Sequence, residues 1–490
     1  METMNGIYDP KNNRHPKLES RRKKKKLSRS LHSNLNLQEG RSSYGVQPLG
    51  NLLFNGSGNH NARDVGLGTL SLFSDETVMD VLGFLDAKDL CHLALVSKAF
   101  YVFSNQESLW RTLVLHQLKG NFSFQGSWKS TYIATHCPFS SSSPTLMSHF
   151  KVSNFYSDYL FQSWLCANLE MKQEWLEVDN IERREKLSLD EFISTFEEPN
   201  RPVLISDVLG NWGSLKKWDR EFLCEVAGDT EFAVGPVDMK LKDYFSYADR
   251  VKEERPLYLF DPKFGDKVPD LSLGYEIPIY FREDLFSLLG KERPDYRWLI
   301  LGPARSGSSF HIDPNSTSAW NAVIKGSKKW ILFPPAVVPP GVHPSPDGAE
   351  VASPVSIIEW FMNFYGETKH WKKRPIECIC RAGEVIFVPN GWWHLVINLE
   401  DSIAITQNYV SRRNLLNVLD FLSRPNSREL VSGTEDRVNL YDKFRRAYED
   451  FSPGSIEELK RRDEEKKSKK SVPFWECATD AKVGAFKFGF

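Results

Sequence analysis

The sequence has 490 residues, of which 41% are hydrophobic and 13% aromatic, a length and composition that allow two to four packed domains. We expect no membrane contact, because no stretch reaches the roughly 18 consecutive apolar residues of a transmembrane helix and Met1–Asn5 lacks the apolar core of a secretory signal. The formal net charge is −1, and the seven cysteines are odd in number and scattered, which favours a reducing compartment over a disulfide framework.

Residues 1–68 are predicted to be a disordered basic tail, since Asn, Ser, Gly and Lys/Arg dominate and large apolar residues are few. Between Lys11 and Arg29 there are ten Lys/Arg and a single acid, Glu19. Such a run indicates a nuclear localisation signal or a patch that contacts nucleic acid, and its plain alternative is a solubilising tail. We therefore predict a location in the nucleus, with nucleic-acid contact by residues 11–29 left open.

Residues 69–115 have apolar residues at helical spacing, with Asp86–Asp89 between two runs and an acid available to cap the second helix. This segment resembles an F-box. The family uses the unit to bind a Skp-type adaptor of cullin ubiquitin ligases, whereas the alternative is a small bundle that packs on the next domain. One departure is that Leu72-Phe73 stands where the family has Leu-Pro. The likeness rests on Leu72, Val81, Leu82, Leu85, Asp89, Leu90, Leu93, Val96, Ser97, Lys98, Phe100 and Trp110.

The rest of the chain divides into three segments. Residues 116–184 are predicted to be a helical linker with a Ser/Pro-rich loop at 138–148. Residues 185–425 begin with a helix at 188–192, capped by Ser188, and continue as short strands separated by Gly/Pro turns, which favours an antiparallel barrel or sandwich. Residues 426–490 are predicted to be a helical region and tail. Strands are expected at 202–205, 256–260, 298–301, 330–333, 384–388 and 402–406.

Two histidines and one aspartate are the candidate metal ligands. His311 and Asp313 are two positions apart, so on an extended strand both side chains point to one face. His394 can join them from a strand that is distant in sequence and adjacent in a barrel. Two histidines and a carboxylate with open coordination positions form the facial triad of non-haem Fe(II) oxygenases. The bare His-x-Asp pattern is weak by itself, because a surface pair has the same spacing.

The surrounding sequence resembles the JmjC-type oxygenases, in the branch of arginine demethylases and lysyl hydroxylases. The likeness rests on Tyr296–Trp298, Gly302-Pro303, Arg305–Gly307, His311–Pro314, Thr317–Ala322, Gly326–Lys328, Pro389–His394 and Ile403–Asn408. It implies a multidomain α+β chain, in which the small helical F-box precedes a double-stranded β-helix (cupin, jelly-roll) domain with flanking helices. It also implies Fe(II), with 2-oxoglutarate and O₂ as cosubstrates.

The resemblance further implies the residues that bind 2-oxoglutarate. Lys328 is the expected cation for the distal carboxylate, a role that suits a charge-assisted hydrogen bond. The plain alternative places it beside Lys329 in a surface turn, and makes its companions ordinary strand or core residues. The other predicted contacts are the hydroxyl donors Thr406 and Tyr258, the amides Asn321 and Asn408, and Ser308, which stands where the family often has Thr.

The leading interpretation is a nuclear Fe(II)/2-oxoglutarate dioxygenase that acts on side chains of histone tails or other basic proteins, most simply as a histone arginine demethylase and chromatin regulator. Lysyl hydroxylation is the close rival. A rival of another class is a substrate receptor of an SCF-type ubiquitin ligase, with the JmjC domain as its binding module. Because the F-box and the metal ligands lie in separate segments, we expect residues 69–115 to be removable without loss of 2-oxoglutarate turnover.

Overall fold

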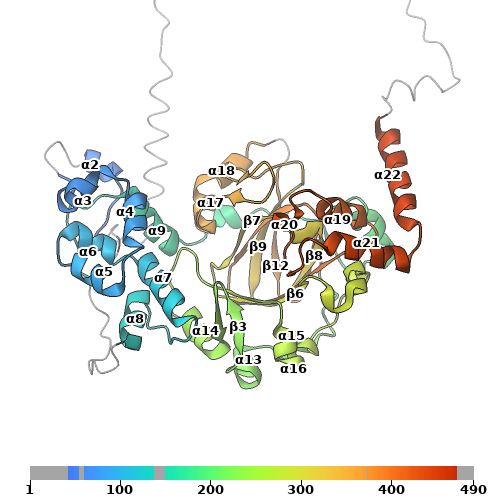
Figure 1. Cartoon of the computed structure of the whole chain (residues 1–490), viewed down its shortest axis with the longest axis horizontal. Coiled ribbons are helices and arrows are strands. Elements are labelled where there is room, and N and C mark those ends of the chain that lie inside the picture. Colours follow the sequence, from blue (N-terminus) through green and yellow to red (C-terminus); the bar gives the residue numbers. More distant parts are fainter. Residues whose placement is uncertain (1–41, 43, 55–59, 137–148, 372–373, 472–490) are drawn as a thin grey trace, which may run out of the picture. The chain divides into compact units, whose positions relative to one another are not determined.

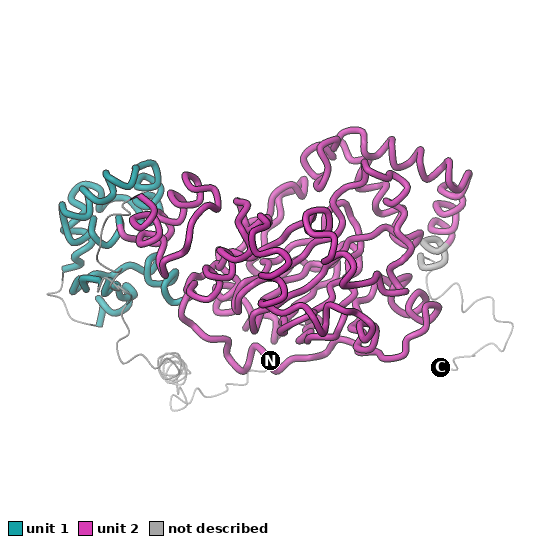
Figure 2. The backbone as a smooth tube through the Cα atoms, turned by 90° about the horizontal axis from the view of Figure 1, so that it is seen from below, with its two compact units in different colours: residues 1–104, 146–165 teal, residues 105–145, 166–490 magenta. Residues whose placement is uncertain are grey.

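The computed structural model (Figure 1) describes residues 42, 44–54, 60–136, 149–371 and 374–471. The basic run at 11–29 and the Ser/Pro-rich loop at 138–148 lie outside these residues. The chain forms two compact units, coloured separately in Figure 2: residues 1–104 with 146–165, and residues 105–145 with 166–490. Among the described residues, no helix is long and apolar enough to cross a membrane.

The first unit is a set of short helices around a small apolar core. Side chains cap two of the helices: Ser74 accepts a hydrogen bond from the amide of Thr77, and Asp86, in the segment expected to supply the cap, accepts one from the amide of Asp89. Val78, Leu90 and similar side chains are buried between the helices. The helices are α2 (Gly50–Phe54), α3 (Ala62–Leu67), the 3-10 helix η1 (Gly68–Leu72), α4 (Asp75–Leu82), α5 (Ala87–Leu93), α6 (Lys98–Ser104) and most of α9 (Asp158–Asn168).

The prediction of disorder as far as residue 68 is wrong for the described part of this segment. Val46 and Leu67 are buried, and Gln47 forms a β-bridge with Tyr156. Asn61 caps α3 and exchanges two hydrogen bonds with the backbone of Tyr156, at 2.8 and 3.0 Å. These partners lie about a hundred residues further along the chain, so local composition contains no sign of them.

The second unit is built on two sheets. The larger has the strand order β1-β2-β13-β8-β15-β6-β5-β3-β4, and the smaller has the order β12-β9-β14-β7. From β6 to β9, and again from β12 to β15, the chain alternates between the sheets, which is the double-stranded β-helix predicted above. The strands are β1 (Arg183–Arg184), β2 (Val203–Ile205), β3 (Glu231–Val234), β4 (Val237–Lys240), β5 (Leu259–Asp261), β6 (Arg297–Gly302), β7 (Gly307–His311), β8 (Ser318–Lys325), β9 (Ser327–Phe333), β12 (Ile376–Arg381), β13 (Val385–Val388), β14 (Trp393–Asn398) and β15 (Ser402–Tyr409), with the hairpin β10 (His343–Pro344) and β11 (Val351–Ala352) outside the two sheets.

A single apolar cluster joins the two sheets. It includes Val323 and Ile386 of the larger sheet with Leu332 and Val396 of the smaller one. The Cys378 and Cys380 thiols are also in this cluster and are fully buried on β12. Five of the six predicted strands are present near the expected residues; the sixth is displaced, because 256–260 becomes a strand only from Leu259.

Helices surround the sheets of this unit (Figure 1). Ser188 caps the predicted helix, and the C-terminal helices pack through a cluster that includes Phe286 and Phe444. The helices are α7 (Glu107–Leu118), α8 (Trp128–His136), α10 (Gln173–Leu176), α11 (Leu189–Phe192), the π-helix η2 (Ile193–Glu197), α12 (Gly213–Lys217), α13 (Arg220–Ala227), α14 (Leu241–Ala248), α15 (Phe264–Lys267), α16 (Pro269–Ser272), the 3-10 helices η3 (Ile279–Phe281), η4 (Leu285–Glu292) and η5 (Pro314–Ser316), α17 (Ile357–Asn363), α18 (Tyr365–Thr368), α19 (Leu415–Leu422), α20 (Ser427–Leu430), α21 (Leu440–Phe451) and α22 (Ser455–Ser471).

Helix α7 belongs to the second unit, although it begins within the predicted F-box segment 69–115 and ends three residues beyond it, at Leu118. Trp110 and Val114 of this helix are buried, and the backbone of Trp128 donates a 2.7 Å hydrogen bond to Glu107. Deleting residues 69–115 would therefore remove part of the unit that contains the metal ligands. The expectation that this segment can be removed without effect on the oxygenase does not agree with the structure.

Candidate metal centre

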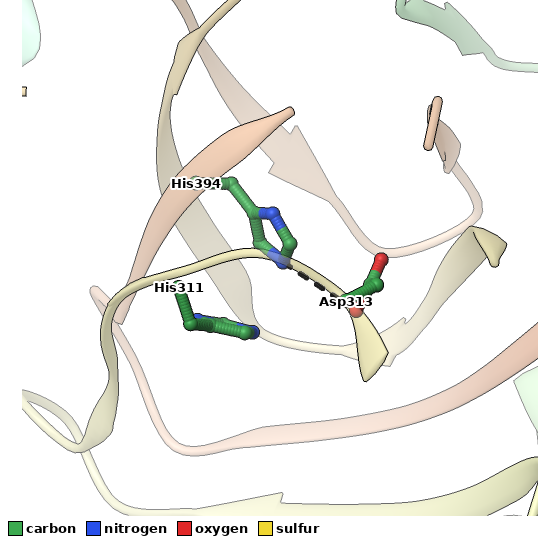
Figure 3. A group of neighbouring side chains, drawn as sticks. All are labelled: His311, Asp313 and His394. Atoms are coloured by element: carbon green, nitrogen blue, oxygen red, sulfur yellow. Dashed lines mark ion pairs between the residues drawn. The ribbon is translucent and has the colours of Figure 1, made fainter. Parts of the chain in front are cut away.

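The three predicted metal ligands meet at one end of the smaller sheet (Figure 3). Strands β7 and β14 are antiparallel neighbours, and their register places His394 directly opposite His311. Asp313 follows β7 by two residues, and its Oδ1 atom lies 3.8 Å from Nε2 of His394. One candidate donor atom from each residue lies within 4.8 Å of the other two. The third ligand thus comes from an adjacent strand that is distant in sequence, as predicted.

Backbone carbonyls orient both imidazole rings. Nδ1 of His311 is 2.8 Å from the carbonyl oxygen of Ser309, and Nδ1 of His394 is 3.0 Å from that of Trp392. Because a carbonyl only accepts, each Nδ1 carries the proton, and each Nε2 keeps its lone pair for a metal ion. This arrangement is the one that metal-binding histidines have in proteins.

The electrostatics of the cluster also suit a divalent cation. Burial lowers the pKa of His394, so this ring is neutral, and burial raises the pKa of Asp313. The Oδ2 atom of Asp313 is buried and has no hydrogen-bond partner in the part of the chain that the structure describes. A buried carboxylate with an unsatisfied oxygen beside two imidazole rings needs a positive charge, and a bound Fe(II) ion would supply it. The residues present therefore fit the predicted metal.

The ligands line a cavity of about 740 Å³, which also contains the predicted cation. The side chain of Lys328 is almost fully buried on β9, and within the described residues Nζ has no recorded hydrogen bond or ion pair. Burial lowers the pKa of this ammonium group to about 8. A cavity of this size holds a small molecule, and an uncompensated buried cation in its wall fits the distal carboxylate of 2-oxoglutarate.

The remaining predicted contacts line the same cavity. The hydroxyls of Tyr258 and Ser308 are 2.9 Å apart, and burial raises the pKa of Tyr258, so the phenol keeps its proton. Thr406 donates a 2.9 Å hydrogen bond to the carbonyl oxygen of Trp320 and lies opposite Asn321 in the β15–β8 register. The Oδ1 atom of Asn321 is buried and has no hydrogen-bond partner among the residues described. The structure thus brings these residues together, while their individual roles remain predictions.

Asn408, the other predicted amide, also lines the cavity, and its Nδ2 atom donates to Thr317 Oγ1 at 2.8 Å. The alternative that placed Lys328 and Lys329 in a surface turn is wrong, since both are buried on β9. Lys329 forms a 2.8 Å ion pair with Glu377 and donates to the carbonyl oxygen of Val178 at 2.7 Å. Successive residues of a strand point to opposite faces, which explains why only Lys328 reaches the cavity.

Sequence reasoning missed several residues of the cavity wall. Asn398 lies directly opposite Lys328 in the β14–β9 register, and its Oδ1 atom is buried without a partner. Trp298 also lines the cavity and stacks on Phe260 with ring centroids 5.3 Å apart. At Gly307, a Cβ atom would lie 2.0 Å from the carbonyl oxygen of Val396, so glycine is needed for β7 to approach β14. Only strand register reveals these positions.

Comparisons with known proteins agree with this geometry. Residues 75–116 match an F-box-like domain, and residues 236–414 match a cupin-like domain. The chain is 64% identical to the arginine-specific demethylase JMJ22 of Arabidopsis thaliana over 449 residues, which cover 91% of this chain and 89% of that protein.

More distant relatives match the oxygenase part of the chain. The bifunctional arginine demethylase and lysyl-hydroxylase psr-1 of Caenorhabditis elegans is 40% identical over 256 residues, which are 48% of this chain and 63% of psr-1. The 2-oxoglutarate and iron-dependent oxygenase JMJD4 of Mus musculus is 31% identical over 271 residues, which are 48% of this chain and 62% of JMJD4. The chain therefore belongs to the JmjC oxygenases of the cupin class, and an F-box-like segment precedes its cupin-like domain.

Proposed function

We propose that this protein is an Fe(II)- and 2-oxoglutarate-dependent dioxygenase that demethylates arginine side chains of basic nuclear proteins, with histone tails as the first candidates. The observation that carries the proposal is the buried, unpartnered Lys328 in the same cavity as the cluster of His311, Asp313 and His394. The 64% identity to an arginine-specific demethylase supports the reaction type.

Different residues of this cavity would bind the metal ion and the cosubstrate. His311, Asp313 and His394 would hold Fe(II), while Lys328 would bind the distal carboxylate of 2-oxoglutarate. When bound, Fe(II), 2-oxoglutarate and O₂ together supply the oxidant that hydroxylates a C–H bond. A hydroxylated N-methyl group leaves as formaldehyde, whereas a hydroxyl on a lysine side-chain carbon remains. Lysyl hydroxylation is the second candidate, because the relative psr-1 is described as having both activities.

Mass spectrometry of peptides separates the two reactions. Histone and splicing-factor peptides that contain dimethylarginine or lysine would be incubated with the enzyme, Fe(II), 2-oxoglutarate and ascorbate. Loss of one CH₂ mass indicates demethylation, and gain of one oxygen indicates hydroxylation. The Asp313→Ala variant is the control. Absence of both mass changes in the wild-type samples, while 2-oxoglutarate is consumed, would contradict both candidate reactions on these substrates.

A second function, adaptor binding, is favoured by the surface of the first unit. Among the described residues, Leu72, Phe84 and Leu95 are more than 80% exposed in or beside the F-box-like match. Apolar side chains that gather in an exposed patch mark sites of protein association. We propose that they bind a Skp-type adaptor, which would make the protein a substrate receptor of a ubiquitin ligase. Phe84→Glu should abolish co-purification with the adaptor, whereas Leu53→Glu, equally exposed on α2, should not.

Arg63 links residues at the start of the F-box-like segment through several hydrogen bonds. Its guanidinium donates to Asp75 at 2.5 Å and to the carbonyl oxygens of Ser71 at 3.0 Å and Phe73 at 2.5 Å. Asp75 in turn accepts a 2.5 Å hydrogen bond from Ser157. These bonds hold the turn around Leu72, which is 88% exposed.

Nuclear location and contact with nucleic acid rest on residues 11–29 alone, so we propose them from the charge pattern of this run. Changing Lys23–Lys26 to alanine should move a fluorescent fusion from the nucleus to the cytoplasm. Unchanged nuclear accumulation would leave the run as a solubilising tail.

A further inference from the structure

The mouth of the catalytic cavity contains positive charge that the metal cluster and Lys328 do not explain. Away from these groups, Arg111, Arg255 and Arg305 line the wall together with the carboxylate of Glu254. The guanidinium of Arg305 donates to the backbone carbonyls of Cys166 and Leu169, which fixes it as an anchor for that segment. Arg111 and Arg255 remain as the guanidinium groups that can face a substrate.

Arg111 comes from α7, inside the F-box-like match, and a polar network holds it at the wall. Its Nε atom lies 3.5 Å from a carboxylate oxygen of Glu253, and is buried without a hydrogen bond. The other oxygen of Glu253 accepts hydrogen bonds from the indole of Trp128 at 2.6 Å and from the hydroxyl of Tyr247 at 3.3 Å. Because Trp128 and Tyr247 fix Glu253, the ion pair with Glu253 also fixes the orientation of Arg111. The N–H groups of the Arg111 guanidinium are then available to a ligand.

Arg255 lies two residues beyond Glu253 and three before Tyr258, on the loop that leads into the catalytic cavity. Its side chain is exposed, and within the described residues the structure records no ion pair or hydrogen bond for its guanidinium. Burial raises the pKa of Tyr258, and the hydrogen bond with Ser308 and the charge of Arg255 oppose this rise. Arg255 and Tyr258 line the same cavity.

The charges along this part of the wall do not cancel, because three arginines and one glutamate, Glu254, line it, and Glu253 adds a carboxylate only beside Arg111. The positive charge of these arginines would repel a uniformly basic peptide that enters the cavity. Guanidinium groups bind carboxylates and phosphates through paired, charge-assisted hydrogen bonds. We propose that Arg111 and Arg255 bind an acidic group of the protein substrate, a carboxylate or a phosphate, close in sequence to the side chain that is oxidised. This proposal refines the substrate class and rests on the proposed function.

Matched peptides test the proposal. Each contains one dimethylarginine and differs only at one flanking position, which is alanine, glutamate or phosphoserine and is moved one residue at a time to either side. Fluorescence anisotropy without Fe(II) gives the affinity, and formaldehyde release with Fe(II) gives kcat/KM. We expect the best acidic peptide to bind about tenfold more tightly than the alanine peptide, as one charge-assisted hydrogen bond allows. Added salt should weaken this preference.

Substitution of the two arginines provides the second arm. In Arg111→Gln and Arg255→Gln, the ratio of acidic-peptide to alanine-peptide affinity should fall towards one. Lys252→Gln is the matched control, because Lys252 is an exposed cation on the same loop that does not line the cavity. A preference for phosphoserine alone would identify a phosphate site, and equal preference for glutamate would identify a general anion site.

Two outcomes would overturn the proposal: equal affinity for all the peptides, or an acidic preference that persists in both arginine variants. Failure of the proposed function gives a different result. In that case no peptide loses a methyl group, and the affinity measurements still decide whether the arginines bind an acidic flank.

Discussion

Lys328 and Lys329 are neighbours on β9, yet they have opposite electrostatic surroundings. The ammonium group of Lys328 lines the catalytic cavity with no counter-ion among the described residues, whereas that of Lys329 lies 2.8 Å from Glu377 in the protein interior. Strand alternation separates the two side chains. One is consequently available to an anionic ligand, and the other is part of the fold.

Lys328→Met should weaken 2-oxoglutarate binding by roughly 1.5–3 kcal/mol, the contribution of a charge-assisted hydrogen bond. The fold should not be weakened, because the change removes a buried charge that has no recorded protein partner. Calorimetric titration of 2-oxoglutarate into the metal-loaded protein measures the first effect, and thermal unfolding measures the second. Wild-type affinity in this variant would mean that another group binds the distal carboxylate.

Lys329→Met should have the reverse profile. It leaves the buried carboxylate of Glu377 without its partner, which typically costs about 3–5 kcal/mol in the free energy of unfolding. The double variant Lys329→Met/Glu377→Gln should recover much of this loss, since no charge then remains. Denaturant unfolding of the two variants checks the difference. Equal stability of wild type and Lys329→Met would show that the ion pair does not contribute.

The affinity for 2-oxoglutarate should fall as the pH rises above about 8, because the pKa of Lys328 is lowered to about 8 by burial and binding needs the ammonium form. Below that pH the group is already protonated and the affinity should be flat. The sign for stability is opposite: the unfolded lysine titrates near 10.5, so the folded protein binds fewer protons between about 8 and 10.5 and gains stability with rising pH there. Lys328→Arg should show no such decline, since a guanidinium stays charged.

The sequence predicts this site because its ligand spacing and family motifs are local. His311 and Asp313 lie two residues apart, and His394 ends the family motif Pro389–His394. All three ligands can therefore be recognised from short stretches of sequence. Positions set by pairing between distant strands are not visible. Asn398 reaches the cavity only because β14 pairs with β9, opposite Lys328.

Contacts between distant segments also explain why the predictions for residues 1–68 and for removal of the F-box segment were wrong. Val46 and Asn61 are ordered by a segment near Tyr156, far along the chain, although their own surroundings are polar. Helix α7 has the helical pattern of the F-box and packs with the oxygenase unit, where Arg111 joins the cavity wall. Helical periodicity identifies a buried face but does not specify the element that covers it.

Asp313→Ala should abolish metal-dependent turnover without destabilising the metal-free protein. The carboxylate has a buried oxygen without a partner, so its removal relieves a desolvation cost of about 1–3 kcal/mol. Adding Fe(II) or Mn(II) under anaerobic conditions should raise the Tm of wild type and leave that of the variant unchanged, because only wild type keeps all three ligands. A metal-induced rise of equal size in both proteins would contradict the assignment of Asp313 as a ligand.

Arg63→Met should loosen the start of the F-box-like segment and reduce adaptor capture. The change leaves Asp75, which is largely buried, without its 2.5 Å partner and frees the carbonyls of Ser71 and Phe73. Breaking such a pair typically costs about 3–5 kcal/mol, so the amides of residues 71–75 should exchange with deuterium much faster.

Asp64→Asn is the matched control, since the Asp64 side chain is mostly exposed and contributes only one of the contacts of Arg63. Turnover of 2-oxoglutarate should be unchanged in both variants, because the metal ligands and Lys328 belong to the other unit. Unaltered exchange in Arg63→Met would show that Arg63 does not hold this turn, and unaltered adaptor capture despite faster exchange would show that the adaptor does not need it.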